Sequence, residues 1–242
     1  MNKKLMLLAL AAVSAAMFAL PAAASAGTWS VSSIEKFTTH SGATTLTLRP
    51  NSEGESVSEV TCTTSTGSGK YTTSTTGEEL TLTFTGCTVP SPFGTLNCNT
   101  SGQASGTIKT TDLKFDNIMI ESTAQKPTVV GPPHQPAGLP GILITANNNH
   151  FASFTCGGFI AIDVEGNGIV GEIERGCGTS ATTAGLNFAS SSTGVQKYTQ
   201  ITTTGTVYDL SAKDTFTGVT RTASMDGTGT VTFPKSQTIT CP

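Results

Sequence analysis

Residues 163 to 174, which read DVEGNGIVGEIE, carry acidic side chains and glycines at the spacing of a calcium-binding loop. Positions 1, 3, 5, 6 and 12 of such a loop are filled by Asp163, Glu165, Asn167, Gly168 and Glu174. An EF-hand also needs a helix on each side of its loop. The flanking stretches FASFTCGGFIAI and RGCGTSATTAG have no helical periodicity, so we expect no EF-hand here.

The same segment is better explained as a β-hairpin. FIAIDVEG and GIVGEIE each alternate polar and apolar residues, as half-buried strands do. Gly166-Asn167-Gly168 between them could supply the positive φ angles of a turn. A calcium site of another kind in this acidic hairpin is the alternative.

Carboxylates on this hairpin could also serve acid–base chemistry. Alternation places Asp163 and Glu165 on one face of the first strand, and Glu172 and Glu174 on one face of the second. Two acids at a fixed separation across a sugar hydrolyse glycosidic bonds. The E-x-D-x-x-E pattern of jelly-roll glycosidases is incomplete in both strands, and a solvated acidic face explains the same residues. We therefore assign no catalytic residue.

Histidines and aromatic residues are sparse. His40, His134 and His150 are scattered and no CxxC pair is present, so we expect no zinc site. His150 follows three asparagines, which could line a polar site or form a turn, because asparagine tolerates left-handed φ. Rings for a sugar-binding surface are limited to Trp29, Tyr71, Tyr198 and Tyr208, since the phenylalanines mostly alternate with polar residues and are expected in the core.

Threonine alternates with apolar residues in segment after segment, and this period of two predicts half-buried strands. Examples are TTLTL at 44–48, LTLTF at 80–84, TVYDL at 206–210 and TVTF at 230–233. Turn-forming clusters such as RPNSEGE and MDGTG separate them, and helical periodicity is absent past residue 26. We predict an all-β fold, a single β-sandwich or flattened barrel.

A proline-rich segment, KPTVVGPPHQPAGLPG at 126–141, divides the chain into two β-rich halves. Its five prolines argue against a helix or a central strand. It could link two domains or cross from one part of a sheet to another. We expect a single all-β domain over 27–242 with a crossing loop, because one domain of this size is ordinary.

Residues 1–26 have the three parts of a secretory signal peptide. Lys3 and Lys4 precede an apolar run over 5–20, and Ala24-Ser25-Ala26 provides a small-residue cleavage site. The run is shorter than the roughly 20 residues of a membrane-spanning helix. We therefore expect a secreted or cell-envelope protein with no membrane-spanning segment after cleavage.

Cleavage would leave an acidic chain. The count of lysine and arginine falls from 13 to 11 against 16 acidic residues, a formal net charge of −5. Such a charge disfavours nucleic acid or an anionic membrane as the main partner. The expected partner is an extracellular or envelope component of unknown identity, and no cofactor or metal is assigned.

Six cysteines follow the cleavage site: Cys62, Cys87, Cys98, Cys156, Cys177 and Cys241. An even number in an exported protein favours disulfides, which can pair in 15 ways. A bridge from Cys87 to Cys98 would close a short loop centred on PSPFG and stabilise the fold by roughly 3 kcal/mol.

Residues 80–175 contain a spaced pattern of glycine and cysteine. It reads F-x-G-C in LTFTGC, then C-x-x-x-G-x-x-x-G-x-I-x-T in CNTSGQASGTIKT, and later FASFTCGG and GNGIVGEI. The pattern resembles a group of uncharacterised secreted bacterial proteins. The resemblance implies export and a β-rich fold in which Cys62, Cys87, Cys98 and Cys156 recur, and it carries no function. Cys177 and Cys241 depart from that pattern.

The predicted pairs are Cys87 with Cys98, Cys62 with Cys156 and Cys177 with Cys241; the resemblance sets the last two cysteines apart from the rest. For function, we expect a non-catalytic exported protein with a binding or envelope-associated structural role. The alternative is a secreted carbohydrate-active hydrolase or sugar-binding module that uses the acidic hairpin at 163–174. A concave pocket where two of its carboxylates converge would favour that alternative, and a flat solvated face would disfavour it.

Overall fold

The structure, a computed structural model, describes residues 27–49, 57–92, 94–121, 138–190, 198–200, 208–215 and 217–242. The segment predicted as a signal peptide, residues 1–26, lies outside these ranges. Within the described part of the chain, no helix is long and apolar enough to cross a membrane.

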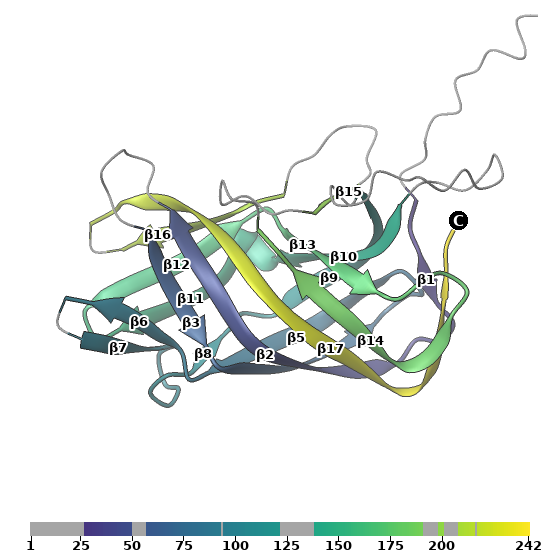
Figure 1. Ribbon diagram of the computed structural model, residues 1–242, viewed down its shortest axis with the longest axis horizontal. Coiled ribbons are helices and arrows are strands. Elements are labelled where there is room, and N and C mark those ends of the chain that lie inside the picture. Colours follow the sequence, from purple (N-terminus) through teal and green to yellow (C-terminus); the bar gives the residue numbers. More distant parts are fainter. Residues whose placement is uncertain are drawn as a thin grey trace, which may run out of the picture.

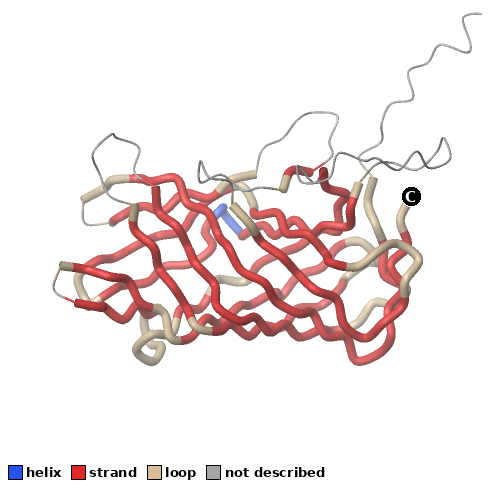
Figure 2. Tube along the Cα trace, in the orientation of Figure 1, coloured by secondary structure: helices blue, strands red, loops and turns tan. Residues whose placement is uncertain are grey.

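Almost all of the described residues are in strands or in the turns that join them (Figure 2). A 3-10 turn, η1 (Asn147–Asn149), joins two of the strands. The strands are β1 (Ser30–Val31), β2 (Lys36–Arg49), β3 (Ser58–Cys62), β4 (Thr64–Tyr71), β5 (Thr76–Thr85), β6 (Thr88–Ser91), β7 (Gly94–Asn99), β8 (Ile108–Lys109), β9 (Leu113–Glu121), β10 (Leu139–Ala146), β11 (His150–Cys156), β12 (Ile160–Gly166), β13 (Ile169–Glu174), β14 (Ser180–Phe188), β15 (Thr199–Gln200), β16 (Leu210–Asp214) and β17 (Thr220–Thr240).

These strands pair antiparallel in one sheet, and several short strands continue one another in line. β3 and β4 pair in turn with the two halves of β2, where Cys62 lies opposite Thr44 and Ser65 lies opposite Ser41. In the same way β5 continues into β6, β7 through β8 into β9, β10 into β11, β12 into β13, and β14 into β16. The described strands therefore amount to eight long, bent strands in up-and-down order, with β1 and β15 as short additions.

The last long strand closes the sheet on the first. β17 pairs with β2 from Thr222 opposite Arg49 to Thr232 opposite Thr38, and the two strands run side by side along the molecule (Figure 1). The all-β prediction is confirmed, and of the two predicted forms the sheet takes the flattened barrel. An eight-stranded closed sheet leaves an interior just wide enough for side chains or for one small ligand.

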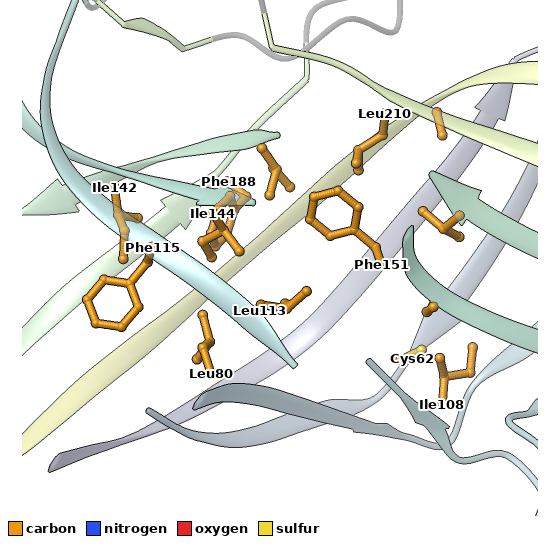
Figure 3. Close-up of a cluster of buried hydrophobic side chains, with 14 of the residues drawn as sticks. Cys62, Leu80, Ile108, Leu113, Phe115, Ile142, Ile144, Phe151, Phe188 and Leu210 are labelled. Atoms are coloured by element: carbon orange, nitrogen blue, oxygen red, sulfur yellow. The ribbon is translucent and has the colours of Figure 1, made fainter. Parts of the chain in front are cut away.

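Apolar side chains fill this interior. Figure 3 shows part of the core, with Phe115 and Ile142 towards one side of the view and Cys62 and Ile108 towards the other. Phe115 is 1% exposed, and its ring meets that of Tyr71 edge-on with the centroids 4.9 Å apart. Most of the described phenylalanines are in the core as expected, but Phe159 is 59% exposed. Phe93 and Phe216 lie outside the described residues.

Trp29 is part of the buried core. Its side chain is 2% exposed, and its Nε1 donates a hydrogen bond of 2.6 Å to the carbonyl oxygen of Gly141. The following strand, β1, pairs Val31 with Ile239 near the end of β17. The first residues after the predicted cleavage site are thus part of the fold.

A second apolar cluster lies on the opposite face of β9, β10 and β13. It consists of Ile118, Ile120, Leu143, Val170 and Tyr198, which are all buried. Tyr198 comes from the connection between β14 and β16. The side chain of Tyr198 therefore packs on an outer apolar face of the sheet.

Three disulfides form, and they join Cys62 to Cys87, Cys98 to Cys156, and Cys177 to Cys241. The third is the predicted pair. The predicted pairs Cys87–Cys98 and Cys62–Cys156 are wrong, because Cys62 bonds to Cys87 and Cys98 bonds to Cys156. Stable disulfides are typical of an oxidising, extracytoplasmic environment.

The register of the strands explains why these four cysteines pair in this way. Cys98 lies directly opposite Cys156 where β7 pairs with β11. Thr61 lies opposite Thr88 where β3 pairs with β6, which places the neighbouring residues Cys62 and Cys87 against each other. Loop length alone favoured the short bridge, but cross-strand neighbours decide which sulfur atoms can meet.

The prediction of a proline-rich loop at 126–141 is wrong for the last three of these residues. Leu139–Gly141 belongs to β10, whereas residues 122–137 lie outside the described ranges. Pro140 lies opposite Met119 of β9, just before β10 begins to pair with β13 at Gly141. At this position on the strand, the missing N–H of proline is tolerated.

Candidate functional site

The acidic segment at 163–174 is not a hairpin. β12 pairs with β11 and β16, whereas β13 pairs with β10 and β14. The glycines at 166 and 168 therefore lie where one long strand bends, and the side chain of Asn167 between them accepts a hydrogen bond from the backbone N–H of Asp209 at 2.9 Å. The two predicted strands exist, but the prediction that they pair with each other is wrong.

The carboxylates of this segment fall into two separate environments. Asp163 accepts a hydrogen bond from the hydroxyl of Ser153 on β11. Glu172 instead interacts with Tyr198. Burial raises the pKa of the Tyr198 hydroxyl most, and the hydrogen bond and charge of Glu172 raise it further. Glu174 lies over Gly185 on β14, and its charge also raises the pKa of Tyr198. The arrangement that would favour glycosidic hydrolysis, two of these acids converging in a pocket, is absent from the cavities found below.

The calcium-loop spacing lacks its structural context as well. Strands, not helices, flank the segment on both sides. Among the described residues, no group of three or more histidine, cysteine, aspartate or glutamate side chains is placed to hold a metal ion.

A serine, a histidine and an aspartate meet on the outer surface of β11 and β12. His150 Nε2 lies 2.8 Å from Ser153 Oγ and 3.8 Å from Asp163 Oδ1. A nucleophilic serine must give its proton to a histidine, and a carboxylate holds that histidine in the orientation that accepts the proton. Here the hydroxyl of Ser153 donates to Asp163, so its only proton points away from His150. This order of contacts does not activate the serine.

The other predicted candidates have structural roles. Asn148 and Asn149 adopt positive φ angles of 56° and 59° in η1, so the asparagine run forms the predicted turn. Trp29, Tyr71 and Tyr198 are buried and cannot act as sugar platforms. His134 lies outside the described residues.

The interior of the closed sheet contains two adjoining cavities. The large interior cavity has a volume of about 90 Å³. The small interior cavity measures about 50 Å³. The side chains that line both are Thr44, Leu82, Phe84, Ile144 and Met225.

Hydroxyl groups interrupt this apolar lining. Thr44 is 6% exposed and Thr39 also lines the small interior cavity, yet neither side-chain oxygen has a hydrogen-bond partner within the described part of the chain. Ser41 and Ser65, in contrast, bond to each other at 2.7 Å. A buried polar atom without a partner costs free energy, so Thr44 and Thr39 are positions where a ligand atom would be stabilised.

Sequence reasoning missed these threonines. Thr44 opens the TTLTL run that predicted a strand, but its inward direction depends on where the alternation shifts along β2. β17 slips in register between Gly227 and Gly229, opposite the stretch of β2 that precedes Thr44. Thr39, Ser41 and Thr44 consequently all line the interior, although strict alternation would not place them together.

Comparisons of the chain with protein-family models, with curated proteins and with solved structures gave no match, so the functional argument rests on the site itself.

Proposed function

We propose that this is an exported, non-catalytic binding protein whose site is the pair of interior cavities. Its ligand is a small apolar molecule with one hydrogen-bonding group. The observation that carries the proposal is Thr44, a residue that lines both cavities and whose buried hydroxyl has no hydrogen-bond partner among the described residues. The closed eight-stranded sheet supports it, because such an interior can hold one small ligand.

The size of the cavities limits the ligand. Together they approach the roughly 150 Å³ at which an apolar cavity takes up benzene. The ligand, or the part of a ligand that enters, therefore has the size of one aromatic ring or a short alkyl chain. An apolar lining with one or two hydroxyls favours phenols and small alcohols over charged molecules.

Export is supported by two independent observations. The residues before Gly27 have the composition of a secretory signal peptide, and all six cysteines are in disulfides. We place the protein outside the cytoplasm, secreted or in the cell envelope. A carbohydrate-active role for the acidic segment at 163–174 gains no support, because none of its carboxylates lines either interior cavity.

Phenol is expected to bind the mature protein about twofold to twelvefold more tightly than benzene, because a hydrogen bond to Thr44 contributes about 0.5–1.5 kcal/mol. The substitution Thr44→Val keeps the shape and removes the hydroxyl, so it should remove this preference while benzene still binds. Titration followed by heteronuclear NMR would measure both affinities.

A substitution that fills the large interior cavity provides a second test of the proposal. Ala152 is buried and lines the large interior cavity, so Ala152→Met should abolish binding of both probes. Ala104→Met places the same side chain on an exposed turn and serves as the matched control. Absence of saturable binding in the parent protein, or equal binding by Ala152→Met and the parent, would overturn the proposal.

A further inference from the structure

We propose a second binding site, separate from the interior cavities, that takes a small organic acid with an aromatic or alkyl part. It is a surface groove of about 430 Å³ where β2, β4 and β17 meet. We call it the β17 groove and define it by the residues that the argument uses: Lys36, Phe37, Lys70, Glu79, Phe233 and Pro234. Its volume lies within the usual range of small-molecule sites.

A large bulge in β17 makes the groove. Thr232 lies opposite Thr183 and Gln237 lies opposite Ala181, so residues 233–236 stand against a single residue of β14. The pairing of β17 with β2 ends at the same Thr232. The wall of the closed sheet therefore opens between the two strands beyond this point.

Arg175 holds the bulge open. Its guanidinium donates hydrogen bonds to the carbonyl oxygens of Ala181, Thr183 and Gln237 at 3.2, 3.3 and 2.8 Å. These are the residues that flank the slip in register. Bulges of this kind recur beside binding and active sites, where they redirect side chains.

A second irregularity lies on the other side of the groove. β4 and β5 slip in register between Ser68 and Lys70, and Glu79 on β5 has a φ of 55°. A side chain other than glycine, asparagine or aspartate is costly in this left-handed region, and such strain tends to persist at functional sites. The carboxylate of Glu79 lies 3.0 Å from Lys70 Nζ.

The charges at the rim favour an anion. Lys36 and Lys70 lie directly opposite each other on β2 and β4, an arrangement of like charges that destabilises a sheet. Glu79 is the one carboxylate among the lining residues, and it bonds to Lys70. Within the described part of the chain Lys36 forms no ion pair with an acidic side chain. Glu78, directly opposite Lys70 on β5, also acts on Lys70. Lys36 is therefore the ammonium group of the groove that a ligand carboxylate would pair with.

The floor of the groove is aromatic. Phe37 and Phe233 are 5% and 7% exposed, with ring centroids 6.0 Å apart. Gly69 makes room for the ring of Phe37, because a Cβ there would lie only 2.6 Å from that ring. A ligand that fits therefore has an apolar part for the rings and an anionic group for Lys36.

Phenylacetate is the probe that tests this site. We expect saturable binding to the full mature chain that weakens as salt concentration rises, with benzyl alcohol and acetate each binding at least tenfold more weakly. Lys36→Gln should weaken phenylacetate binding about tenfold, whereas Lys109→Gln, an exposed lysine on another strand, should leave it unchanged. Glu79→Gln should strengthen it, because it frees Lys70.

Equal losses in Lys36→Gln and Lys109→Gln would show diffuse charge attraction and overturn the site. Acetate binding as tightly as phenylacetate, or no saturation with phenylacetate up to millimolar concentration, would do the same. Thr44→Val and Ala152→Met are expected to leave phenylacetate binding unchanged, so this proposal and that for the interior cavities fail or hold separately.

Discussion

Replacing Cys98 and Cys156 together by alanine is expected to lower the free energy of unfolding by about 4 kcal/mol. The two residues are 58 apart in sequence, and the loop-closure entropy of a loop that long gives a value of this size. A loss this large is a substantial part of the total stability of an ordinary domain.

The effect should also be local, because the sheet is joined by short ladders at this point. β7 pairs with β11 through Thr155 opposite Asn99 and Cys156 opposite Cys98. On its other side the hairpin of β6 and β7 is joined to β3 at Thr61, next to the Cys62–Cys87 disulfide. The disulfides therefore close the ring of strands where hydrogen bonds are fewest.

Urea unfolding and amide hydrogen exchange would measure the two consequences. The double substitution of Cys98 and Cys156 should accelerate exchange in residues 88–99 well beyond the rest of the sheet. Removing Cys177 and Cys241, whose separation of 64 residues predicts a similar total loss, should leave exchange in 88–99 at its original rate. Equal protection of 88–99 in both variants would contradict the role assigned to the Cys98–Cys156 disulfide.

Trp29→Ala should lower the free energy of unfolding by about 3–5 kcal/mol, the usual cost of truncating a buried aromatic side chain. The indole packs in the core, and its loss would also leave the carbonyl oxygen of Gly141 without the hydrogen bond it now accepts.

Trp29→Phe separates the two contributions. It retains most of the apolar contact and removes only the N–H donor, so we expect a smaller loss of about 1–3 kcal/mol. Denaturant unfolding followed by circular dichroism is suitable for all three proteins, since the chain has a single tryptophan and the variants lose its fluorescence. A loss below about 1 kcal/mol for Trp29→Ala would contradict the role assigned to the indole in the core.

The strands were predictable because their signal is local. The alternating runs at 44–48, 80–84 and 230–233 lie in β2, β5 and β17. The closure of β17 on β2 has no comparable signal, because it joins strands from the two ends of the described chain. Alternation indicates which residues face one side, but it does not identify the partner strand.

Three features depend on bends and register, and the sequence could not reveal them. Glycines at 166 and 168 interrupt an alternating run in the same way whether the chain reverses or continues with a bend. The cysteine partners follow from which strands lie side by side, which loop length does not indicate. The cavity hydroxyl of Thr44 and the β17 groove both arise at slips in register, where a period of two no longer assigns faces.

The most direct test of the proposed function is to locate a bound phenol by NMR. Nuclear Overhauser contacts from its ring protons should reach the methyl groups of Met225 and Ala152, which line the large interior cavity, and Ala152→Met should remove them. Contacts confined to exposed residues, and unchanged in Ala152→Met, would contradict an interior site and with it the proposed function.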